Sequence, residues 1–127
     1  MAVFKTLTKR SDFLRVQRNN QKYVTSCMVL QIAPNHELSQ SHTRVGFTAS
    51  KKIGNATKRN FAKRRMRALV ALQRDALVES ADYILIARRA MLIKKFSEIE
   101  SEIISALHSL NKRFSLQKAD TVPNRIN

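Results

Sequence analysis

Hydrophobic residues along the chain follow two periods, and these predict strands and helices in turn. From Tyr23 to Ala33 the sequence is rich in strand-forming residues. Arg44 to Ser50 alternates apolar and polar residues, which predicts a second strand paired antiparallel with the first. The polar run from Asn35 to Thr43 would be the loop between them. The apolar residues expected on one face of the first strand are Val24, Met28, Leu30 and Ile32.

Helical spacing appears in three places. A short helix is predicted from Ser11 to about Arg18, a long one from about Ala56 to Val78, and a last one from about Ser97 to Phe114. Gly54 supplies a turn before the long helix, which Asn55 or Thr57 can cap. The predicted buried stripe of the long helix is Ala62, Met66, Leu69, Val70 and Leu77, and that of the last helix is Ile99, Ile103, Leu107, Leu110 and Phe114.

The run Tyr83 to Ala87, YILIA, predicts a strand buried on both faces. A strand, a long helix and another strand imply a parallel crossover, so the fold class is α/β. The length of 127 residues suits one domain. We expect that domain to cover residues 1–118 and residues 119–127 to form a loose tail.

Lysine and arginine are concentrated between Arg44 and Arg74, where the chain has ten of them and no acid. The formal net charge is +15, while a hydrophobic content of 43% is ordinary for a folded protein. The charge therefore belongs to a folded surface. It favours nucleic acid, because each lysine or arginine contact with a phosphate releases condensed counterions.

Membrane association is not expected, since no segment approaches the roughly 18 to 20 apolar residues of a membrane span. The N-terminus has no apolar run of signal-peptide length, and Cys27 is the only cysteine. A cytoplasmic location is the plain expectation.

The chain offers little for catalysis of its own. The three histidines are scattered and, with one cysteine, have no zinc-ligand spacing. Two-metal phosphodiester cleavage requires clustered carboxylates, which the basic segment lacks. The glycine-rich nucleotide-binding motifs are missing as well. We therefore expect neither catalytic residues nor a protein-bound metal.

Phosphate binding needs only charge and backbone donors, and both are present. Lys51, Lys52 and the Gly54 turn precede a helix N-terminus, where the helix dipole attracts anions. Arg59, Lys63 and Arg67 recur every four residues and would form a ridge along the helix. These features do not distinguish DNA from RNA.

The run Arg44 to Arg67, RVGFTASKKIGNATKRNFAKRRMR, resembles the signature of the bacterial ribonuclease P protein subunit. The resemblance includes the Lys-Lys-x-Gly-Asn-Ala turn and the Arg-Asn-x-x-Lys-Arg helix. It extends to an early KRSDF segment, a DYILIAR strand and the amphipathic last helix. It implies a small mixed sheet of three to four strands with three helices, similar to domain 2 of ribosomal protein S5. It also implies a left-handed βαβ crossover, against the general preference for right-handed ones.

The resemblance also implies a function. The protein would assist an endoribonuclease whose RNA subunit removes the 5′ leader of precursor tRNA, with magnesium held by the RNA and substrate and one protein per RNA. The positions implied to bind the RNA subunit are Lys51, Lys52, Asn55, Arg59, Asn60, Lys63, Arg64 and Arg67. Those implied to bind the leader are Phe13, Gln17, Gln31, Lys63 and Arg67. The family holds the leader in a cleft between the first helix and the sheet, and the resemblance assigns Phe13 to the wall of that cleft.

Three positions depart from the pattern. Phe61 replaces the usual second arginine of the helix motif, leaving a ring that can stack on a base or pack on a neighbour. Gln17 and Gln31 stand where relatives place aromatic residues, so hydrogen bonding is expected to substitute for stacking. Two other functions fit the composition: a ribosomal or RNA-chaperone protein that shares the fold and charge, and a protein-only nuclease, which the missing carboxylates disfavour.

Overall fold

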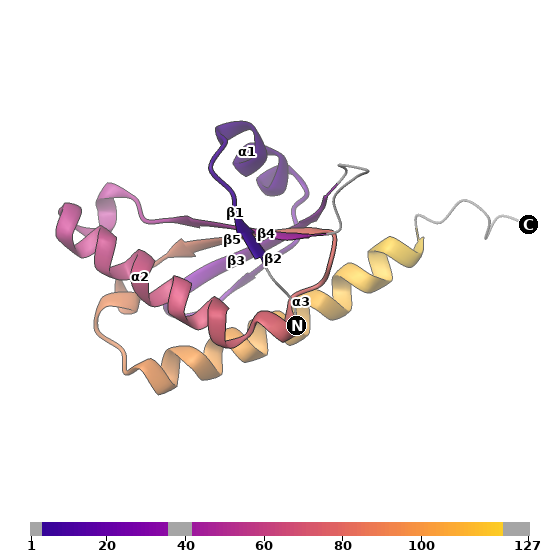
Figure 1. The fold of residues 1–127 in the computed structure, drawn as a ribbon. Coiled ribbons are helices and arrows are strands. Elements are labelled where there is room, and N and C mark those ends of the chain that lie inside the picture. Colours follow the sequence, from indigo (N-terminus) through magenta and orange to yellow (C-terminus); the bar gives the residue numbers. More distant parts are fainter. Residues whose placement is uncertain (1–3, 36–41, 121–127) are drawn as a thin grey trace, which may run out of the picture.

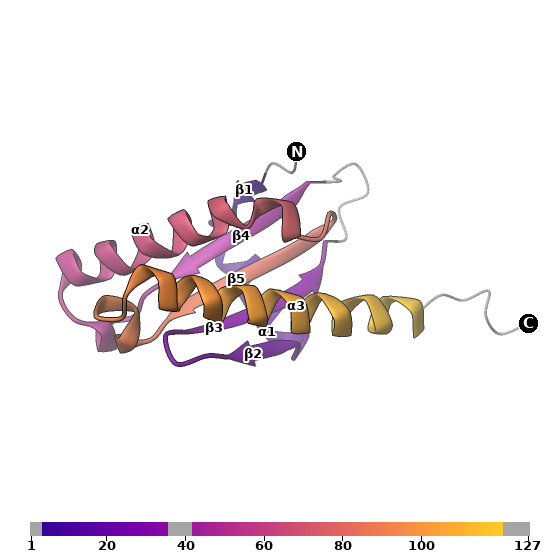
Figure 2. The ribbon, with the colours of Figure 1, turned by 90° about the horizontal axis from the view of Figure 1, so that it is seen from below.

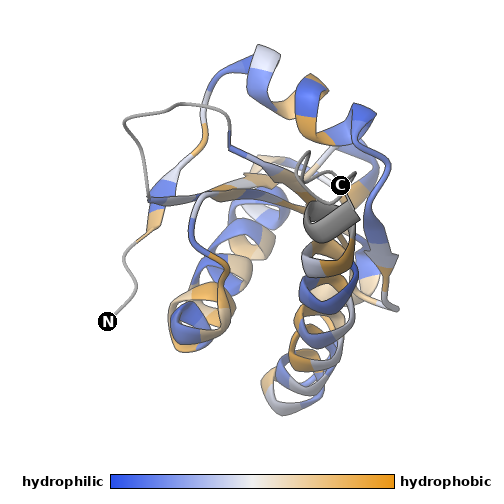
Figure 3. Cartoon of the chain, turned by 90° about the vertical axis from the view of Figure 1, so that its right-hand side faces the viewer, coloured by the Kyte–Doolittle hydropathy of each residue, from blue (hydrophilic) through white to orange (hydrophobic). Residues whose placement is uncertain are grey.

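A five-stranded mixed sheet divides the helices into two layers (Figure 1). The computed structural model describes residues 4–35 and 42–120. Helix α1 covers one face of the sheet, and α2 and α3 lie side by side on the other, both striped with hydrophobic and hydrophilic residues (Figure 3). The elements are β1 (Phe4–Thr6), α1 (Arg10–Arg18), β2 (Lys22–Val24), β3 (Met28–Pro34), β4 (Thr43–Thr48), α2 (Ala56–Leu72), β5 (Ala81–Ala87) and α3 (Phe96–Asp120), with short 3-10 turns η1 (Lys51–Ile53), η2 (Arg74–Ala76) and η3 (Arg89–Leu92).

The strand order is β1-β4-β5-β3-β2. Strand β4 pairs parallel with both β1 and β5, whereas β3 pairs antiparallel with β5. The predicted antiparallel pairing of the two early strands was therefore wrong. Strand β5 lies between them because its run of apolar residues is buried on both faces, and only a central position provides that.

The connection from β4 through α2 to β5 is left-handed, as the resemblance implied. In Figure 2 both strands run to the left, α2 returns to the right in front of the sheet, and β5 lies below β4. The expected α/β class and the three helices are confirmed. The sheet has five strands rather than three or four, because β1 was not predicted and the first predicted strand is two strands.

The segment predicted as one strand, Tyr23 to Ala33, reverses direction at Thr25. The Thr25 hydroxyl accepts hydrogen bonds from the backbone N–H groups of Cys27 (3.2 Å) and Met28 (3.0 Å), which closes a tight turn between β2 and β3. Met28, Leu30 and Ile32 share the buried face as predicted. Val24 does not, because the reversal places it on the opposite face.

Helix α2 ends at Leu72, earlier than the predicted Val78. The chain then turns through η2 to enter β5, and side chains hold this turn in place. The Asn111 amide donates to the Ala76 carbonyl (2.7 Å), and the Tyr83 hydroxyl donates to Asn111 (2.6 Å) while accepting from the Val78 N–H (2.9 Å). Such contacts come from distant residues, so helical periodicity does not reveal them.

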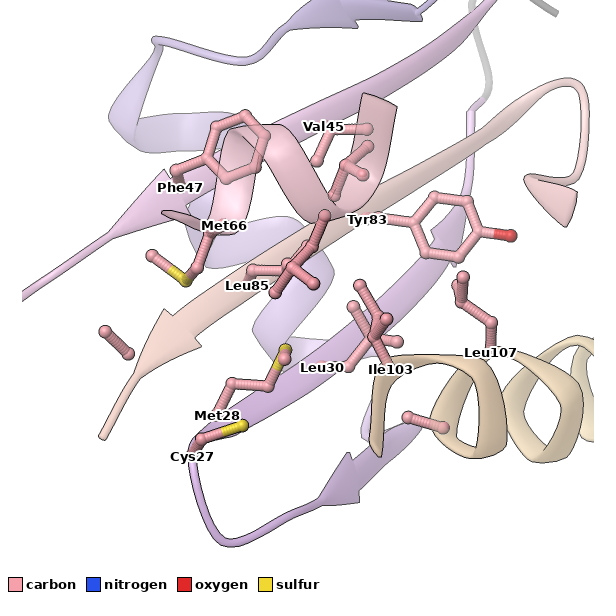
Figure 4. Packing of buried hydrophobic residues seen from close by; sticks show 14 of the residues in the cluster. Cys27, Met28, Leu30, Val45, Phe47, Met66, Tyr83, Leu85, Ile103 and Leu107 are labelled. Carbon is pink, nitrogen blue, oxygen red and sulfur yellow. The ribbon is translucent and has the colours of Figure 1, made fainter. Parts of the chain in front are cut away.

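The core lies between the sheet and the pair of helices α2 and α3 (Figure 4). All five predicted stripe residues of α3 are buried, as are all five predicted for the long helix, although Leu77 lies beyond the end of α2. Helix α3 continues to Asp120 and so includes the first two residues of the predicted tail. The rest of that segment, 121–127, lies outside the described residues.

The layer formed by α1 rests on a much smaller apolar cluster. The fully packed members are Leu7, Val16, Ala33 and Ile84, with Phe13 and Ile86 packed against them. An ionic network compensates for this small cluster. The buried carboxylate of Asp82 accepts two hydrogen bonds from Arg44 of β4 (2.9 and 2.8 Å) and one from Arg15 of α1. Arg15 also donates to the Pro34 carbonyl (2.8 Å), so it joins α1 to two strands.

Replacing Asp82 should therefore destabilise the protein more than the small change in side-chain size would suggest. We expect Asp82→Asn to lower the free energy of unfolding by about 3 kcal/mol, because two mostly buried guanidinium groups lose their nearest shared carboxylate and keep only that of Asp12, at 3.6 and 3.7 Å. Urea denaturation measures this change. Asp75→Asn, at an exposed acid, is the matched control and should stay within about 0.5 kcal/mol of the parent. Equal stabilities for the two variants would contradict the prediction.

A second polar cluster ties the β2–β3 turn to α3. Glu102 accepts hydrogen bonds from the Ser26 N–H (3.0 Å), the Ser26 hydroxyl (2.7 Å), the Cys27 thiol (3.2 Å) and the Lys94 ammonium group (2.7 Å). Burial alone would raise the pKa of Glu102, but these hydrogen bonds outweigh it and lower the pKa to about 2. Burial also raises the pKa of the Cys27 thiol to about 11, so the thiol stays protonated and acts as a donor.

The lowered pKa of Glu102 predicts a pH dependence of stability. Since the folded pKa lies below the ordinary value of 4.5, the stabilisation is complete above pH 4.5 and is lost as the pH falls toward 2. Glu102→Gln should remove this contribution. We expect a loss of about 1 kcal/mol at neutral pH, discounted for solvent access, and a flatter stability profile below pH 4.5. Denaturation at several pH values measures it, with Glu100→Gln as control; parallel profiles for parent and Glu102→Gln would refute it.

Candidate nucleic-acid interface

The cations of the acid-free segment fall into two groups. Arg44 is bound to Asp82, and Arg65 donates to the carbonyls of Met91 (2.6 Å) and Lys94 (2.8 Å). These two side chains are fixed by the fold. By contrast, the predicted phosphate-binding cations have no ion pair with a carboxylate in the described part of the chain: Lys51, Lys52, Arg59, Lys63, Arg64 and Arg67.

Helix α2 presents most of these cations on one flank. Its buried stripe faces the sheet and α3, while Asn60, Arg64 and Arg67 are exposed and Arg59 and Lys63 are half-buried. The Arg67 guanidinium lies 5.5 Å from the centroid of the Phe47 ring, which orients it along the β4 side of the helix. The Nε of Arg59 is buried with no hydrogen-bond partner among the described residues. The predicted ridge of Arg59, Lys63 and Arg67 is present in the structure.

The turn before α2 has the predicted caps. Asn55 is the N-cap and accepts from the Lys58 N–H (3.0 Å), and Gly54 has φ of 142°, a conformation that side-chain-bearing residues rarely adopt. Lys51 and Lys52 are exposed in η1, directly ahead of the helix N-terminus. These two residues thus precede the positive end of the α2 dipole in the chain.

The face of the sheet that carries α1 is only partly covered. One row of side chains crosses four strands on this face, and we call it the open row: Val24, Val29, Ile86 and Thr48. Val24 is 53% exposed and the other three are half-buried. The corresponding row on the opposite face, Tyr23, Leu30, Leu85 and Phe47, belongs to the core or packs against it. The open row is therefore an apolar surface available to a ligand.

The next row on the same face consists of Lys22, Gln31, Ile84 and Gly46. It has two features expected of a leader site. Gln31 lies between Lys22 and Ile84, and its side-chain oxygen is buried without a hydrogen-bond partner among the described residues. Phe13 of α1 packs above Gly46 of the same row. A Cβ at Gly46 would lie 2.6 Å from the ring of Phe13, so only glycine allows this approach.

The predicted leader residues do not all come together. Phe13 and Gln31 belong to the α1 face of the sheet, and Gln17 is exposed on α1 in a hollow that Leu14 and Arg18 also line. Lys63 and Arg67 lie on α2, on the other side of the sheet (Figure 1). A strand of nucleic acid that touches both groups would have to pass around an edge of the sheet.

Sequence reasoning missed the open row, although part of its signal was present. The alternation from Arg44 to Ser50 puts Thr48 on the polar side of its strand, but no pattern in the sequence separates Val29 and Ile86 from core residues. Alternation within a single strand cannot show which face remains uncovered. That depends on where α1 packs, and the Asp82 network places α1 toward one end of the sheet.

The carboxylates of the described residues are poorly suited to hold magnesium. Nowhere in residues 4–35 and 42–120 do three or more histidine, cysteine, aspartate or glutamate side chains gather as metal ligands would. Asp82 is occupied by two guanidinium groups and Glu102 by an ammonium group and a hydroxyl. In the same ranges no helix is both long enough and apolar enough to cross a membrane.

These features define a class of protein. It is a small basic α/β protein in which one side of the sheet carries a helix whose ridge cations lack carboxylate partners among the described residues, and the other side is partly open. Comparison with known families makes the assignment specific. A family model described as Ribonuclease P matches residues 1–111, and the chain belongs to this family of ribonuclease P protein components.

Relatives agree along most of the chain. It is 37% identical to the ribonuclease P protein component of Paramagnetospirillum magneticum, covering 91% of both chains, and 35% identical to that of Citrifermentans bemidjiense, covering 86% of this chain and 90% of the relative. The solved structure of the Staphylococcus aureus RNase P protein matches with a TM-score of 0.70 and 27% identity over 81% of this chain and 92% of that one. The Thermotoga maritima RNase P protein, at 21% identity, shares the fold with a TM-score of 0.68 over 80% of this chain and 93% of that one.

Proposed function

We propose that this chain is the protein subunit of a ribonuclease P, binding both the catalytic RNA subunit and the 5′ leader of precursor tRNA. The RNA subunit would carry out magnesium-dependent cleavage to form the mature 5′ end of the tRNA. The observation that carries the proposal is the set of unpaired cations along η1 and α2 in a chain of this family. One protein per RNA and a cytoplasmic location are part of the proposal.

Binding of the RNA subunit is assigned to α2 and the turn before it. Cations spaced four residues apart follow one side of a helix at intervals of about 6 Å, similar to the distance between successive phosphates of a nucleic-acid strand. Arg64 and Asn60 extend this surface outward. Lys51, Lys52 and Asn55 would engage a phosphate near the positive end of the helix dipole.

Leader binding is assigned to the α1 face of the sheet. An extended single strand needs apolar surface for its bases and a few polar groups that orient them. The open row supplies the apolar surface, and Phe13 stands at its α1 side on the neighbouring row. The Gln31 oxygen is buried without a hydrogen-bond partner among the described residues, which costs about 1–3 kcal/mol. A turn of this side chain toward the ligand would let the oxygen accept a hydrogen bond from a base or a ribose hydroxyl.

Magnesium is assigned to the RNA subunit and substrate, because the carboxylates of the described residues are engaged internally or dispersed. The contribution of the protein would be positional. Its cations would lower the repulsion between two polyanions, and its open row would hold the leader beside the scissile bond. Less magnesium should then be required for the same rate.

Reconstitution tests the proposal. The chain added to a cognate RNA subunit should lower the magnesium concentration needed for cleavage of precursor tRNA, and it should favour precursors with a leader of several nucleotides over those with a single one. In the same assay, Gln31→Leu should weaken only the long-leader precursor. No gain at low magnesium, or equal affinity for ribosomal RNA fragments and the RNA subunit, would indicate instead a general RNA-binding protein of the same fold.

The ridge on α2 gives a quantitative prediction. Arg67→Ala should weaken binding of the RNA subunit and reduce the slope of log affinity against log salt by roughly 1, because one phosphate contact is lost. Arg59→Ala should act in the same direction. Lys112→Ala, at an exposed cation on α3, is the control and should leave the slope unchanged. Filter-binding titrations at several salt concentrations measure this, and an unchanged slope for Arg67→Ala would remove Arg67 from the interface.

A further inference from the structure

The flank of α2 that faces α3 differs from the cationic ridge. Phe61 lies on this flank and is 37% exposed, although it is a large apolar side chain. It belongs to neither of the two hydrophobic clusters and is not among the half-buried residues packed against them. Its ring instead contacts two guanidinium groups, with the Cζ of Arg65 at 5.5 Å and that of Arg64 at 5.8 Å from the centroid.

Arg65 holds this arrangement in place. Its two terminal nitrogens donate to the carbonyls of Met91 (2.6 Å) and Lys94 (2.8 Å), so the plane of its guanidinium cannot rotate freely. The same group lies 5.9 Å from the centroid of Phe96, which packs against the core. Phe61, Arg65 and Phe96 thus form a column of ring, guanidinium and ring that is anchored at its inner end.

The outer end of the column meets the solvent among cations. Arg64, whose guanidinium contacts the Phe61 ring, is exposed. An aromatic ring that is fixed by one cation, partly open and beside a second, exposed cation has the properties of a stacking platform for nucleobases. Because the ring is already ordered, little conformational entropy would be lost on binding.

We infer that Phe61 is a stacking site for an unpaired nucleobase of the RNA that α2 binds, a role that rests on the proposed function. The base would lie on the open part of the Phe61 ring, while Arg64 contacts the adjoining phosphate. Every base has a π-face, so the site would select unpaired nucleotides rather than a particular sequence. The family pattern has an arginine at this position; the chain would thus exchange one ionic contact for a stacking contact.

Salt dependence separates stacking from charge. Phe61→Ala should weaken binding of the RNA subunit roughly 5- to 150-fold, the range observed for a lost base–aromatic stack, without changing the salt slope. Phe61→Leu, which keeps apolar packing but removes the aromatic face, should lose affinity as well. Phe61→Arg should make the slope steeper by roughly 1. Leu72→Ala, an exposed apolar side chain on the same flank, is the control and should bind as the parent does.

Fluorescence tests the contact directly, because the chain contains no tryptophan. Phe61→Trp supplies the single tryptophan of the variant, which can be excited selectively over the two tyrosines, and stacking on a base should quench its emission when the RNA subunit is added. Leu72→Trp, on the same helix, should show little quenching. Thermal denaturation of each variant without RNA confirms that it is folded.

The outcomes distinguish this inference from the proposed function. If the parent binds a mixed-sequence single-stranded RNA but not the RNA subunit, the proposed function fails, and quenching of the tryptophan at position 61 by that RNA still supports the stacking site. Unchanged affinity of Phe61→Ala, full affinity of Phe61→Leu, or an RNA complex without quenching would overturn the stacking site while leaving the proposed function intact. Absence of any RNA binding would overturn both.

Discussion

The carboxylate of Asp82 is fully buried in a chain with a net charge of +15, and it joins helix α1 to the sheet. It accepts hydrogen bonds from Arg44 of the neighbouring strand and from Arg15 of α1. Few apolar residues lie beneath α1, so hydrophobic burial alone would hold that helix weakly. The ionic network therefore holds α1 over the Asp82 end of the sheet and away from the open row.

The same network also changes how the positive charge of the chain is understood. Arg44 and Arg65 belong to a segment without acids, yet both are bound by internal acceptors and contribute to the fold. By contrast, the cations of η1 and of the α2 ridge have no carboxylate partner among the described residues. Some cations of this segment thus stabilise the fold, while others remain exposed on its surface. Only the three-dimensional partners of each side chain distinguish the two groups.

The sheet separates two surfaces of different chemistry. Its α2 side carries the cationic ridge and the Phe61 column, suited to a folded polyanion with occasional unpaired bases. Its α1 side carries apolar residues and one unpaired glutamine oxygen, suited to an extended strand. The proposed function would require two such surfaces at once, and the sheet holds them on its two sides.

Much of this molecule could be predicted from local pattern. The Asn55 cap, the Gly54 turn and the buried stripes of α2 and α3 follow from spacing along a single segment, and the structure contains them all. Ridge residues such as Lys63 and Arg67 were also identified, because an acid-free helix has no nearby carboxylate to bind them. The turn at Thr25 was missed, since a strand-rich composition conceals a reversal made by one hydroxyl group.

What the sequence alone determined, then, is the set of helices, the class of fold and the polyanionic character of the partner, because periodicity and charge are local properties. Only the tertiary structure decided that β5 separates β3 from β4, that Asp82 binds Arg15 and Arg44, and that Val29, Ile86 and Thr48 form one open surface. These features join residues far apart in the chain. Their pairing is selected by burial and by the satisfaction of buried charge across the whole domain, which no single segment encodes.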